Sequence, residues 1–487
     1  MYKYLYETLR DYANLGVYPF NMPGHKNNGD FFDSIFPTID VTELDWSDDL
    51  YNADGVLLRS MERAARVFGA KRTIFLTGGS TAGILAAVIS CAREGEKILV
   101  ARNCHRSVYS GLIFSGAAPV YVYPEIHSCG AAGGIDVKQI AETVEKNPGI
   151  KAAILTSPTY DGFVSDIKKI SAVLREKNII LIVDEAHGAH FKFHNEFPET
   201  ALENGADIVV QSLHKTLPAL GQSALLHAGA GLSDEICLKM MKTLATVQTS
   251  SPSYLIMGLI DRLAGFLETG ELDFGGYVKR LLSLRERIKN ANFQLIGRET
   301  INNFSVYDYD ISKLMIIAGV GLSVSCAELS KILARDFKLQ MEMSAEKYVL
   351  GMTSVADTDE GFERLAAAIE KIGRGGYFGS AGNKNDAVTE RVNPKINGIK
   401  TNCDIKTELE IDSPRFDLKT EAILTPRRAM NSKTAVLPAA DCIGEIAADF
   451  IVRTPPGVPI LVPGERITSE ILDYAARKNI SEIAVVR

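Results

Sequence analysis

Short apolar runs recur between residues 55 and 254 of this chain, and stretches with helical periodicity separate most of them. An apolar run bounded by turn residues is typical of a strand that is buried on both faces, as in a parallel sheet. The alternation of such strands with helices predicts an α/β fold whose mostly parallel, seven-stranded sheet carries helices on both faces. The predicted strands are 74–76, 98–100, 120–122, 152–155, 179–183, 208–210 and 224–227.

The segments on either side of this region have different patterns. Residues 1–54 begin with an amphipathic stretch at 2–15, which predicts a helix, and continue through turn-rich loops. Residues 255–372 start with a long helical pattern and then pass into a smaller α/β domain. The strands predicted for that domain are 306–308, 313–317, 340–343 and 348–351.

The last part of the chain begins with a change in composition. Residues 373–405 are rich in Gly, Asn and Lys, which predicts a linker. Residues 406–487 then alternate short apolar runs with a predicted helix near 439–450 and a loop of prolines and glycines at 454–465. This pattern predicts a C-terminal α+β domain.

Composition and charge narrow the class of protein. The 487 residues carry a net charge of −7, which argues against nucleic-acid binding and suits a small cationic partner. We find no apolar run of membrane-spanning length, and charges interrupt the N-terminal segment where a signal peptide needs an apolar core. Seven scattered cysteines without a Cys-x-x-Cys pair indicate reduced thiols in a cytoplasmic protein. The spacing of His187, His190 and His194 matches no zinc motif, so we expect no metal.

A lysine follows closely after one of the predicted strands. Lys215 lies in the segment 211–216, just beyond the apolar run that ends at Val210. Lysine is rare at such a place unless its amine has a partner or a chemical use, and a Schiff base to pyridoxal phosphate is one such use. The plain alternative is an exposed lysine in a loop, and the tetrapeptide Ser-Leu-His-Lys alone does not exclude it.

Three upstream segments favour the hypothesis that Lys215 binds pyridoxal phosphate. Asp184 ends a run of five apolar residues, where an acid can keep the pyridine nitrogen of the cofactor protonated. Residues 77–83 place glycines and hydroxyls between a strand and a helix, which is typical of a phosphate cradle. His105 follows the strand at 98–100 and can lie flat on an aromatic ring. The order of these elements is more specific than any one of them.

Together these residues resemble the bacterial ornithine/lysine/arginine decarboxylases of pyridoxal phosphate fold type I, over nearly the whole chain. The matching motifs lie at 22–26, 40–44, 48–50, 77–83, 103–107, 157–160, 184–188, 212–215, 455–459 and 463–465. The chain looks most like the shorter, Gram-positive-type arginine decarboxylases. The resemblance implies a PLP-dependent transferase fold with an antiparallel last strand in its large sheet. It also implies a homodimer or higher homo-oligomer.

The resemblance assigns roles to individual residues. Lys215 would carry the cofactor, Asp184 would hold the ring nitrogen, and His105 would stack on the ring. The remaining expected cofactor contacts are Gly79, Ser80, Thr81, Ala186, His187, Ser212, His214 and, from the neighbouring subunit, Ser250. Either His214 or Lys215 would return a proton to the substrate carbon. Residue types alone leave transamination and side-chain cleavage open, and the resemblance favours decarboxylation.

The substrate follows from the resemblance as well. We expect arginine, giving agmatine, ahead of lysine, giving cadaverine, with ornithine third. Glu465 ends a proline-rich loop and is the candidate acid for the distal cation, although it can equally begin the next helix. A catalytically degenerate homologue that binds the cofactor or a polyamine and regulates a partner is the non-enzymatic alternative. The joint presence of His105, Asp184 and Lys215 argues against it.

Overall fold

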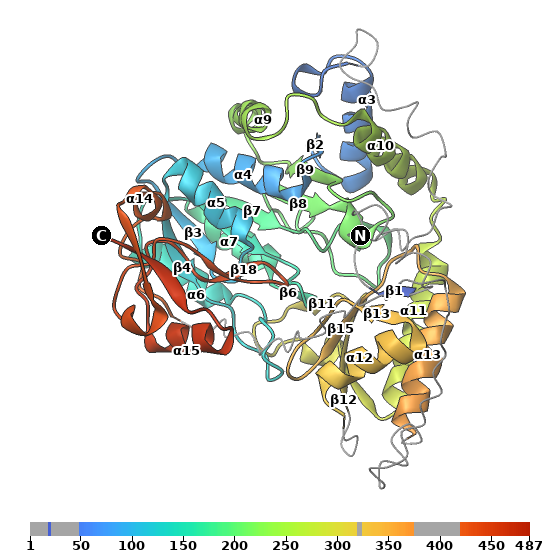
Figure 1. Ribbon diagram of the computed structural model, residues 1–487. Helices are drawn as coiled ribbons and strands as arrows, with labels where there is room; N and C mark the ends of the chain where they lie inside the picture. Colours follow the sequence, from blue (N-terminus) through green and yellow to red (C-terminus); the bar gives the residue numbers. More distant parts are fainter. Residues whose placement is uncertain (1–17, 21–47, 319–323, 375–418) are drawn as a thin grey trace, which may run out of the picture.

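The computed structural model describes residues 18–20, 48–318, 324–374 and 419–487 (Figure 1). A large sheet with its helices lies at the centre and left of the view, and a smaller sheet with helices of its own lies at the lower right. The C-terminal elements, drawn in red, lie against the opposite end of the large sheet. The predicted helix at 2–15, the motif at 22–26 and nearly all of the predicted linker fall outside the described residues.

The large sheet contains all seven predicted strands. They are β2 (Arg72–Leu76), β3 (Lys97–Ala101), β4 (Ala118–Val122), β5 (Ile150–Thr156), β7 (Ile180–Asp184), β8 (Ile208–Ser212) and β9 (Ala224–Ala228). Their order across the sheet is β2-β9-β8-β7-β5-β3-β4. Strand β9 is antiparallel to both neighbours, and the other pairs are parallel. The prediction of a mostly parallel sheet with an antiparallel last strand is therefore confirmed.

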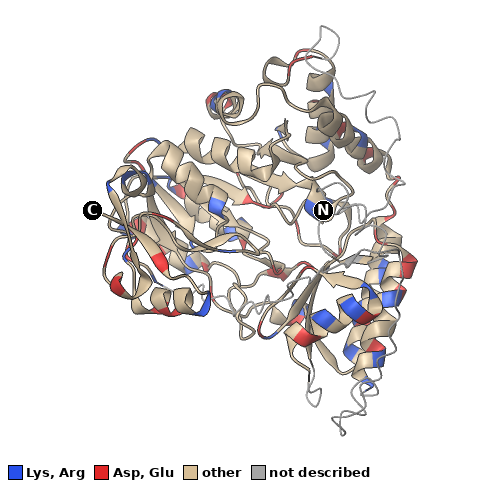
Figure 2. Ribbon diagram, viewed as in Figure 1, with Lys and Arg blue, Asp and Glu red and all other residues tan. Residues whose placement is uncertain are grey.

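Helices cover both faces of this sheet. Those around it are α4 (Gly79–Cys91), α5 (Arg106–Ser115), α6 (Val137–Lys146), α7 (Ile167–Glu176) and α9 (Asp234–Val247). Right-handed crossovers place α4 and α5 on one face and α6 and α7 on the other, in agreement with the contacts within each pair. Helix α4 also packs on α9, so it is apolar and buried on nearly every side. It is tan along its whole length in Figure 2, because it contains no charged residue.

A second layer of helices flanks the large sheet at the top of Figure 1. Helix α3 (Val56–Phe68) packs against α10 (Tyr254–Thr269), and the short turn η2 (Leu50–Asn52) lies beside α9. Another short turn, η3 (Phe191–Phe193), follows β7. A single helical turn, α8 (Leu213–Thr216), directly follows β8 and carries Lys215.

The smaller sheet has four antiparallel strands in the order β10-β12-β15-β14. They are β10 (Phe293–Ile296), β12 (Lys313–Ala318), β15 (Val349–Met352) and β14 (Met343–Ser344). The helices of this part are α11 (Phe274–Asn290), α12 (Cys326–Phe337) and α13 (Asp359–Gly373), whose outer faces carry charges of both signs in Figure 2. The turn η4 (Arg298–Thr300) follows β10. Strand β10 was not predicted, because its Phe-Gln-Leu-Ile run is short and is interrupted by the exposed Gln294.

Two further predicted strands pair outside this sheet. The strand predicted at 306–308 is β11 (Asp308–Tyr309), and it pairs with β6 (Phe163–Val164) of the large part instead. Strand β13 (Leu339–Met341) pairs in parallel with β1 (Tyr18–Phe20) from the start of the chain. Both pairings tie the smaller part to segments that are distant in sequence.

The C-terminal elements enclose a hydrophobic cluster of their own. They are α14 (Pro426–Asn431), β16 (Thr434–Pro438), η5 (Ala439–Asp441), β17 (Ile451–Arg453), β18 (Val458–Leu461), α15 (Ser469–Arg477) and β19 (Glu482–Val486). The helix predicted near 439–450 is wrong, because only η5 forms there. Gly444 takes a φ of +81°, and Ile446 and Ala447 form isolated β-bridges. Among the described helices, none combines the length and apolar character needed to cross a membrane.

Candidate active site

A cavity opens at the carboxyl ends of the parallel strands of the large sheet. Such an edge is where open α/β sheets place their ligands. Its walls are Ser80, Asn103, His105, Ala132, Thr156, Thr159, Tyr160, Asp161, Asp184, Ala186, His187, Lys215, Pro456 and Val458. The last two residues belong to the C-terminal part, which therefore closes one side of the cavity.

Lys215 brings an amine into this cavity because β8 ends directly before the turn of α8. Its Nζ lies 3.1 Å from Nε2 of His187. Burial lowers the pKa of Lys215, and the negative charges of Asp184 and Glu342 oppose that change. An amine whose pKa is lowered by burial is a better nucleophile near neutral pH than an exposed lysine.

Asp184 ends strand β7 and is 4% exposed. One carboxylate oxygen accepts the backbone N–H of Ala186 at 3.2 Å. Burial raises the pKa of Asp184, while the charge of Lys215 and the N–H of Ala186 act in the opposite direction. A buried carboxylate is stabilised by a cation beside it, and a protonated ring nitrogen is such a cation.

The start of α4 has the features that an anion cradle requires. No side chain caps this helix, so N–H groups of its first turn remain available, and Gly79 takes a φ of +70°. Ser80 lines the cavity, whereas Thr81 is exposed beside it. The amide oxygen of Gln248 accepts the N–H groups of Thr77 and Gly78, both at 3.1 Å, and so fixes the turn that leads into the helix.

Several buried polar atoms at and around this cradle have no hydrogen-bond partner. They include Oγ1 of Thr77 in the cradle itself, Oγ of Ser212 at the end of β8 and Oδ1 of Asn103 in the cavity wall. Buried polar atoms are nearly always paired in proteins, so an orphaned one indicates a missing partner. The uncapped helix and the orphaned Ser212 hydroxyl fit a phosphate group, and Asp184 fits a ring nitrogen. The residues present therefore fit pyridoxal phosphate.

His105 forms a flat wall of the cavity and caps helix α5. Its Nδ1 accepts the N–H of Ser107 at 3.2 Å and lies 2.9 Å from the Ser107 hydroxyl. Gly457 lies close to the ring, since a Cβ added to Gly457 would lie 2.8 Å from Nε2 of His105. Burial, with the charges of Lys215 and Arg106, lowers the pKa of His105 to about 4. The ring is therefore neutral at physiological pH.

Besides the cradle residues Gly79 and Thr81 and the strand-end residue Ser212, three further expected site residues lie outside the cavity walls. His214 is half-buried and its Nδ1 lies 3.1 Å from the carbonyl oxygen of Ser223. Ser250 is exposed in the loop between α9 and α10. Glu465 is 1% exposed, and its carboxylate is hydrogen-bonded to other residues of the chain.

The carboxylate of Glu465 has four hydrogen-bond donors. Arg102 donates to both oxygens, at 3.0 and 3.2 Å, and the Thr420 hydroxyl and the Val462 N–H donate at 2.6 and 2.9 Å. Glu465 is also four residues before the first residue of α15, Ser469, so it does not begin that helix. The structure supports neither role considered for it in the sequence.

Several residues of the site were given no role from the sequence. Asn103, Tyr160 and Asp161 line the cavity from loops after β3 and β5. Their place beyond the ends of buried strands is a signal that could have identified them, and Asn103 and Tyr160 also lie within the matching motifs at 103–107 and 157–160. Lys313 and Glu342 come from the smaller part of the protein, and only the packing of the two parts brings them near Lys215 and His187.

The chain is similar to known arginine and lysine decarboxylases over nearly its whole length. The arginine decarboxylase of Halalkalibacterium halodurans is 30% identical over 96% of this chain and 91% of its own length. The constitutive lysine decarboxylase of Escherichia coli is 24% identical over 96% of this chain and 76% of its own length. The solved structure of that lysine decarboxylase superposes with a TM-score of 0.74 at 19% identity, covering 99% of this chain and 81% of the other.

Family models match most of the chain. The model described as "Orn/Lys/Arg decarboxylase, major domain" matches residues 4–312, and that of the family's C-terminal domain matches residues 413–480. The cavity of Lys215, Asp184 and His105 lies within the first match, and its Pro456–Val458 wall lies within the second. The chain therefore belongs to the Orn/Lys/Arg decarboxylase family.

Proposed function

We propose that this protein removes the α-carboxylate of L-arginine to give agmatine and CO₂, with pyridoxal phosphate as cofactor. The observation that carries the proposal is the convergence of Lys215, Asp184 and His105 on one cavity. The relatives named arginine decarboxylase favour arginine, because they match at higher identity than the lysine decarboxylase does. Agmatine production would connect the protein to polyamine synthesis.

The cofactor would be held by groups from several strand ends. Ser80, the N–H groups of α4 that follow Gly79 and the orphaned hydroxyl of Ser212 would bind its phosphate. The N–H of Gly79 itself already donates to the carbonyl oxygen of Gln222. Asp184 would bind its ring nitrogen. When bound, pyridoxal phosphate supplies an electron sink for the pair of electrons that departing CO₂ leaves behind.

The protein's own residues then set the conditions for losing the carboxylate. The amine of Lys215 acts as nucleophile and proton carrier, because burial lowers its pKa. His105 remains neutral against the ring because its pKa is about 4. A neutral wall offers no cation to the substrate carboxylate, and a poorly stabilised carboxylate is lost more readily.

The distal guanidinium of arginine needs a carboxylate, and Glu342 is our candidate. Its Oε1 accepts the hydroxyl of Tyr160, which lines the cavity, and its charge acts on Lys215. Asp161 also lines the cavity, but its charge is already opposed by Arg453 and Lys313. A guanidinium can make two hydrogen bonds to one carboxylate, whereas an ammonium acts as a point charge.

We further propose a homodimer in which Ser250 of one subunit reaches the cofactor phosphate of the other. The support is the exposure of Ser250 in the single chain, next to the Gln248 that anchors the phosphate turn. Subunits of this kind associate through symmetric surfaces, so each would complete the other's site.

Incubation of the cofactor-loaded protein with arginine tests the reaction. We expect agmatine and CO₂ in equal amounts, and Lys215→Ala should abolish both. Binding of the cofactor without release of CO₂ from any basic amino acid would favour the regulatory alternative instead.

A further inference from the structure

A second lysine is buried close to the cavity, and it takes part in none of the proposed reaction steps. Lys313 is the first residue of β12 and is 1% exposed. Its side chain passes Gly162, where an added Cβ would lie 2.8 Å from Cγ of Lys313, and Gly162 takes a φ of +101°. A buried ammonium is costly without partners, so a lysine held this closely calls for an account of its contacts.

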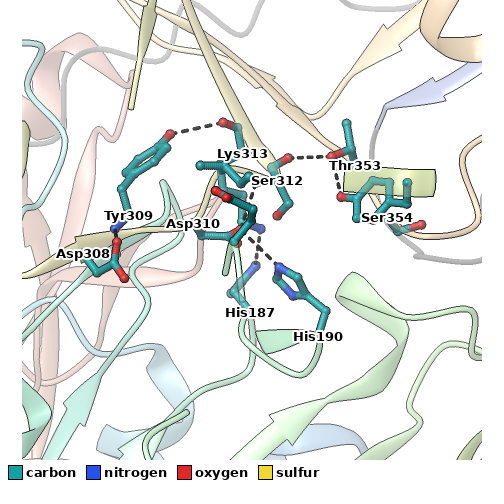
Figure 3. A network of polar contacts seen from close by, with 12 residues as sticks. His187, His190, Asp308, Tyr309, Asp310, Ser312, Lys313, Thr353 and Ser354 are labelled. Carbon is teal, nitrogen blue, oxygen red and sulfur yellow. Dashed lines mark hydrogen bonds and ion pairs between the residues drawn. The ribbon is translucent and has the colours of Figure 1, made fainter. Parts of the chain in front are cut away.

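The ammonium of Lys313 faces His187. Its Nζ lies 3.3 Å from Nδ1 of His187, across the junction of the two parts of the protein (Figure 3). The other ring nitrogen of His187, Nε2, lies 3.1 Å from Nζ of Lys215. One imidazole therefore bridges two lysines, of which one is the proposed catalytic residue.

Two buried acids, one from each part of the protein, favour a charged Lys313. Asp310 is fully buried, accepts the N–H of Ser312 at 2.9 Å and faces His190 at 3.1 Å (Figure 3). His190 and Lys313 hold the pKa of Asp310 low against the effect of burial. Lys313 also opposes the rise in the pKa of Asp161 that burial causes. These two carboxylates stabilise a charged Lys313.

The contacts of His187 determine which of its ring nitrogens carries a proton. Burial lowers the pKa of His187 well below its ordinary value, and the charges of Lys215, Lys313, His214 and His105 act in the same direction. A neutral imidazole has one N–H and one lone pair, and an ammonium can only donate. If Lys313 donates to Nδ1, the proton of His187 is on Nε2 and points at Lys215.

We propose that Lys313 is a positioning residue: its ammonium fixes the Nε2–H form of His187, which donates to Lys215 and keeps that amine unprotonated. This deepens the proposed function and rests on it, because an unprotonated Lys215 is what a nucleophile requires. Asp184 and Glu342 are the acids that favour protonation of Lys215, so the N–H of His187 opposes them.

Labelling of the cofactor-free protein measures the proton state of Lys215 directly. Acetic anhydride reacts with the free amine only, and mass spectrometry of the Lys215 peptide over a pH series gives the midpoint of its labelling. We expect Lys313→Met to raise this midpoint by about one pH unit, the size of one hydrogen bond to a charged group. Lys313→Arg keeps the donor and should restore most of the original value.

A double-mutant cycle separates this role from a plain charge effect. His187→Asn should raise the midpoint by itself, and Lys313→Met added to His187→Asn should then change it little. If Lys313→Met raises the midpoint equally with and without His187, Lys313 acts only through space and the proposal is overturned. An unchanged midpoint in Lys313→Met or in His187→Asn also overturns it, and the second variant decides if the first does not fold.

Lys347→Met is the matched control. Lys347 lies in the same part of the protein, but it is exposed and donates to the carbonyl oxygen of Ser128. Its loss should leave the Lys215 midpoint unchanged. Because the labelling needs neither cofactor nor turnover, its result stands apart from whether the protein decarboxylates arginine.

Discussion

Arg102 and Glu465 form a two-point ion pair inside the protein, with N···O distances of 3.0 and 3.2 Å. Arg102 directly follows β3 and precedes the cavity residues Asn103 and His105, whereas Glu465 belongs to the C-terminal part. Arg102 also donates to the carbonyl oxygens of Pro459 and Ile460. The pair therefore fixes the C-terminal wall of the cavity to the large sheet.

Substitution of Glu465 should affect stability more than substrate binding. Glu465→Gln leaves a buried guanidinium without its counter-charge, which typically costs about 3–5 kcal/mol. We expect a clear drop in the free energy of unfolding by chemical denaturation, with little change in the KM for arginine. Glu421→Gln is the control, because its pair with Arg466 is exposed and should be worth under about 1 kcal/mol. Unchanged stability with a sharply raised KM would return Glu465 to a substrate role.

Gly457 should be intolerant of a side chain because of His105. Its φ is +89°, and an added Cβ would lie 2.8 Å from two atoms of the His105 ring. Gly457→Ala should shift the ring and lower kcat. Gly444→Ala provides the matched control, since Gly444 has a similar φ of +81° but no atom within 4 Å of an added Cβ. Equal kcat in the two variants would show that the contact between Gly457 and the His105 ring does not affect catalysis.

The low pKa of His105 predicts a loss of stability in acid. Between the ordinary pKa of 6.5 and the folded value of about 4, the unfolded chain binds a proton here and the folded protein does not. The free energy of unfolding therefore falls as the pH drops through this window, by up to about 3 kcal/mol from this group. Denaturation of the cofactor-free protein at several pH values should show a smaller loss in His105→Gln. Parallel curves for the two proteins would contradict the assignment.

The proposal that two subunits share each site predicts complementation between subunits. Lys215→Ala and Ser250→Glu should each be inactive alone, because one removes the amine and the other places a negative charge beside a phosphate. After subunit exchange, mixed dimers contain one site with both native residues, and part of the activity should return. Native mass spectrometry of differently tagged subunits confirms the exchange. Confirmed exchange without recovered activity would mean that Ser250 does not serve the neighbouring site.

Local sequence determines the large sheet but not the walls contributed from elsewhere. The runs that became β3, β7 and β8 are apolar on both faces, so their strands were predictable, and so was the carboxylate that ends β7. The helix predicted near 439–450 failed because Gly444 adopts a left-handed conformation and Ala447 bridges to Val485. Local apolar spacing carries no information about such a long-range bridge.

The misassignment of Glu465 has a related cause. Its partner Arg102 lies 363 positions earlier, and no local pattern marks the two as neighbours. Lys313 was missed for the same reason, because a lysine at the start of a strand is usually solvated. The contact with His187 arises only when the smaller part packs on the large sheet.

Initial rates of CO₂ release from arginine, lysine and ornithine, with the cofactor-loaded wild-type protein, test whether the protein is an arginine decarboxylase. We expect release from arginine with the highest kcat/KM of the three, and a lower kcat/KM for arginine in Glu342→Gln. A higher kcat/KM for lysine would contradict the choice of substrate. No release from any of the three, in protein shown to bind the cofactor at Lys215, would contradict the reaction itself.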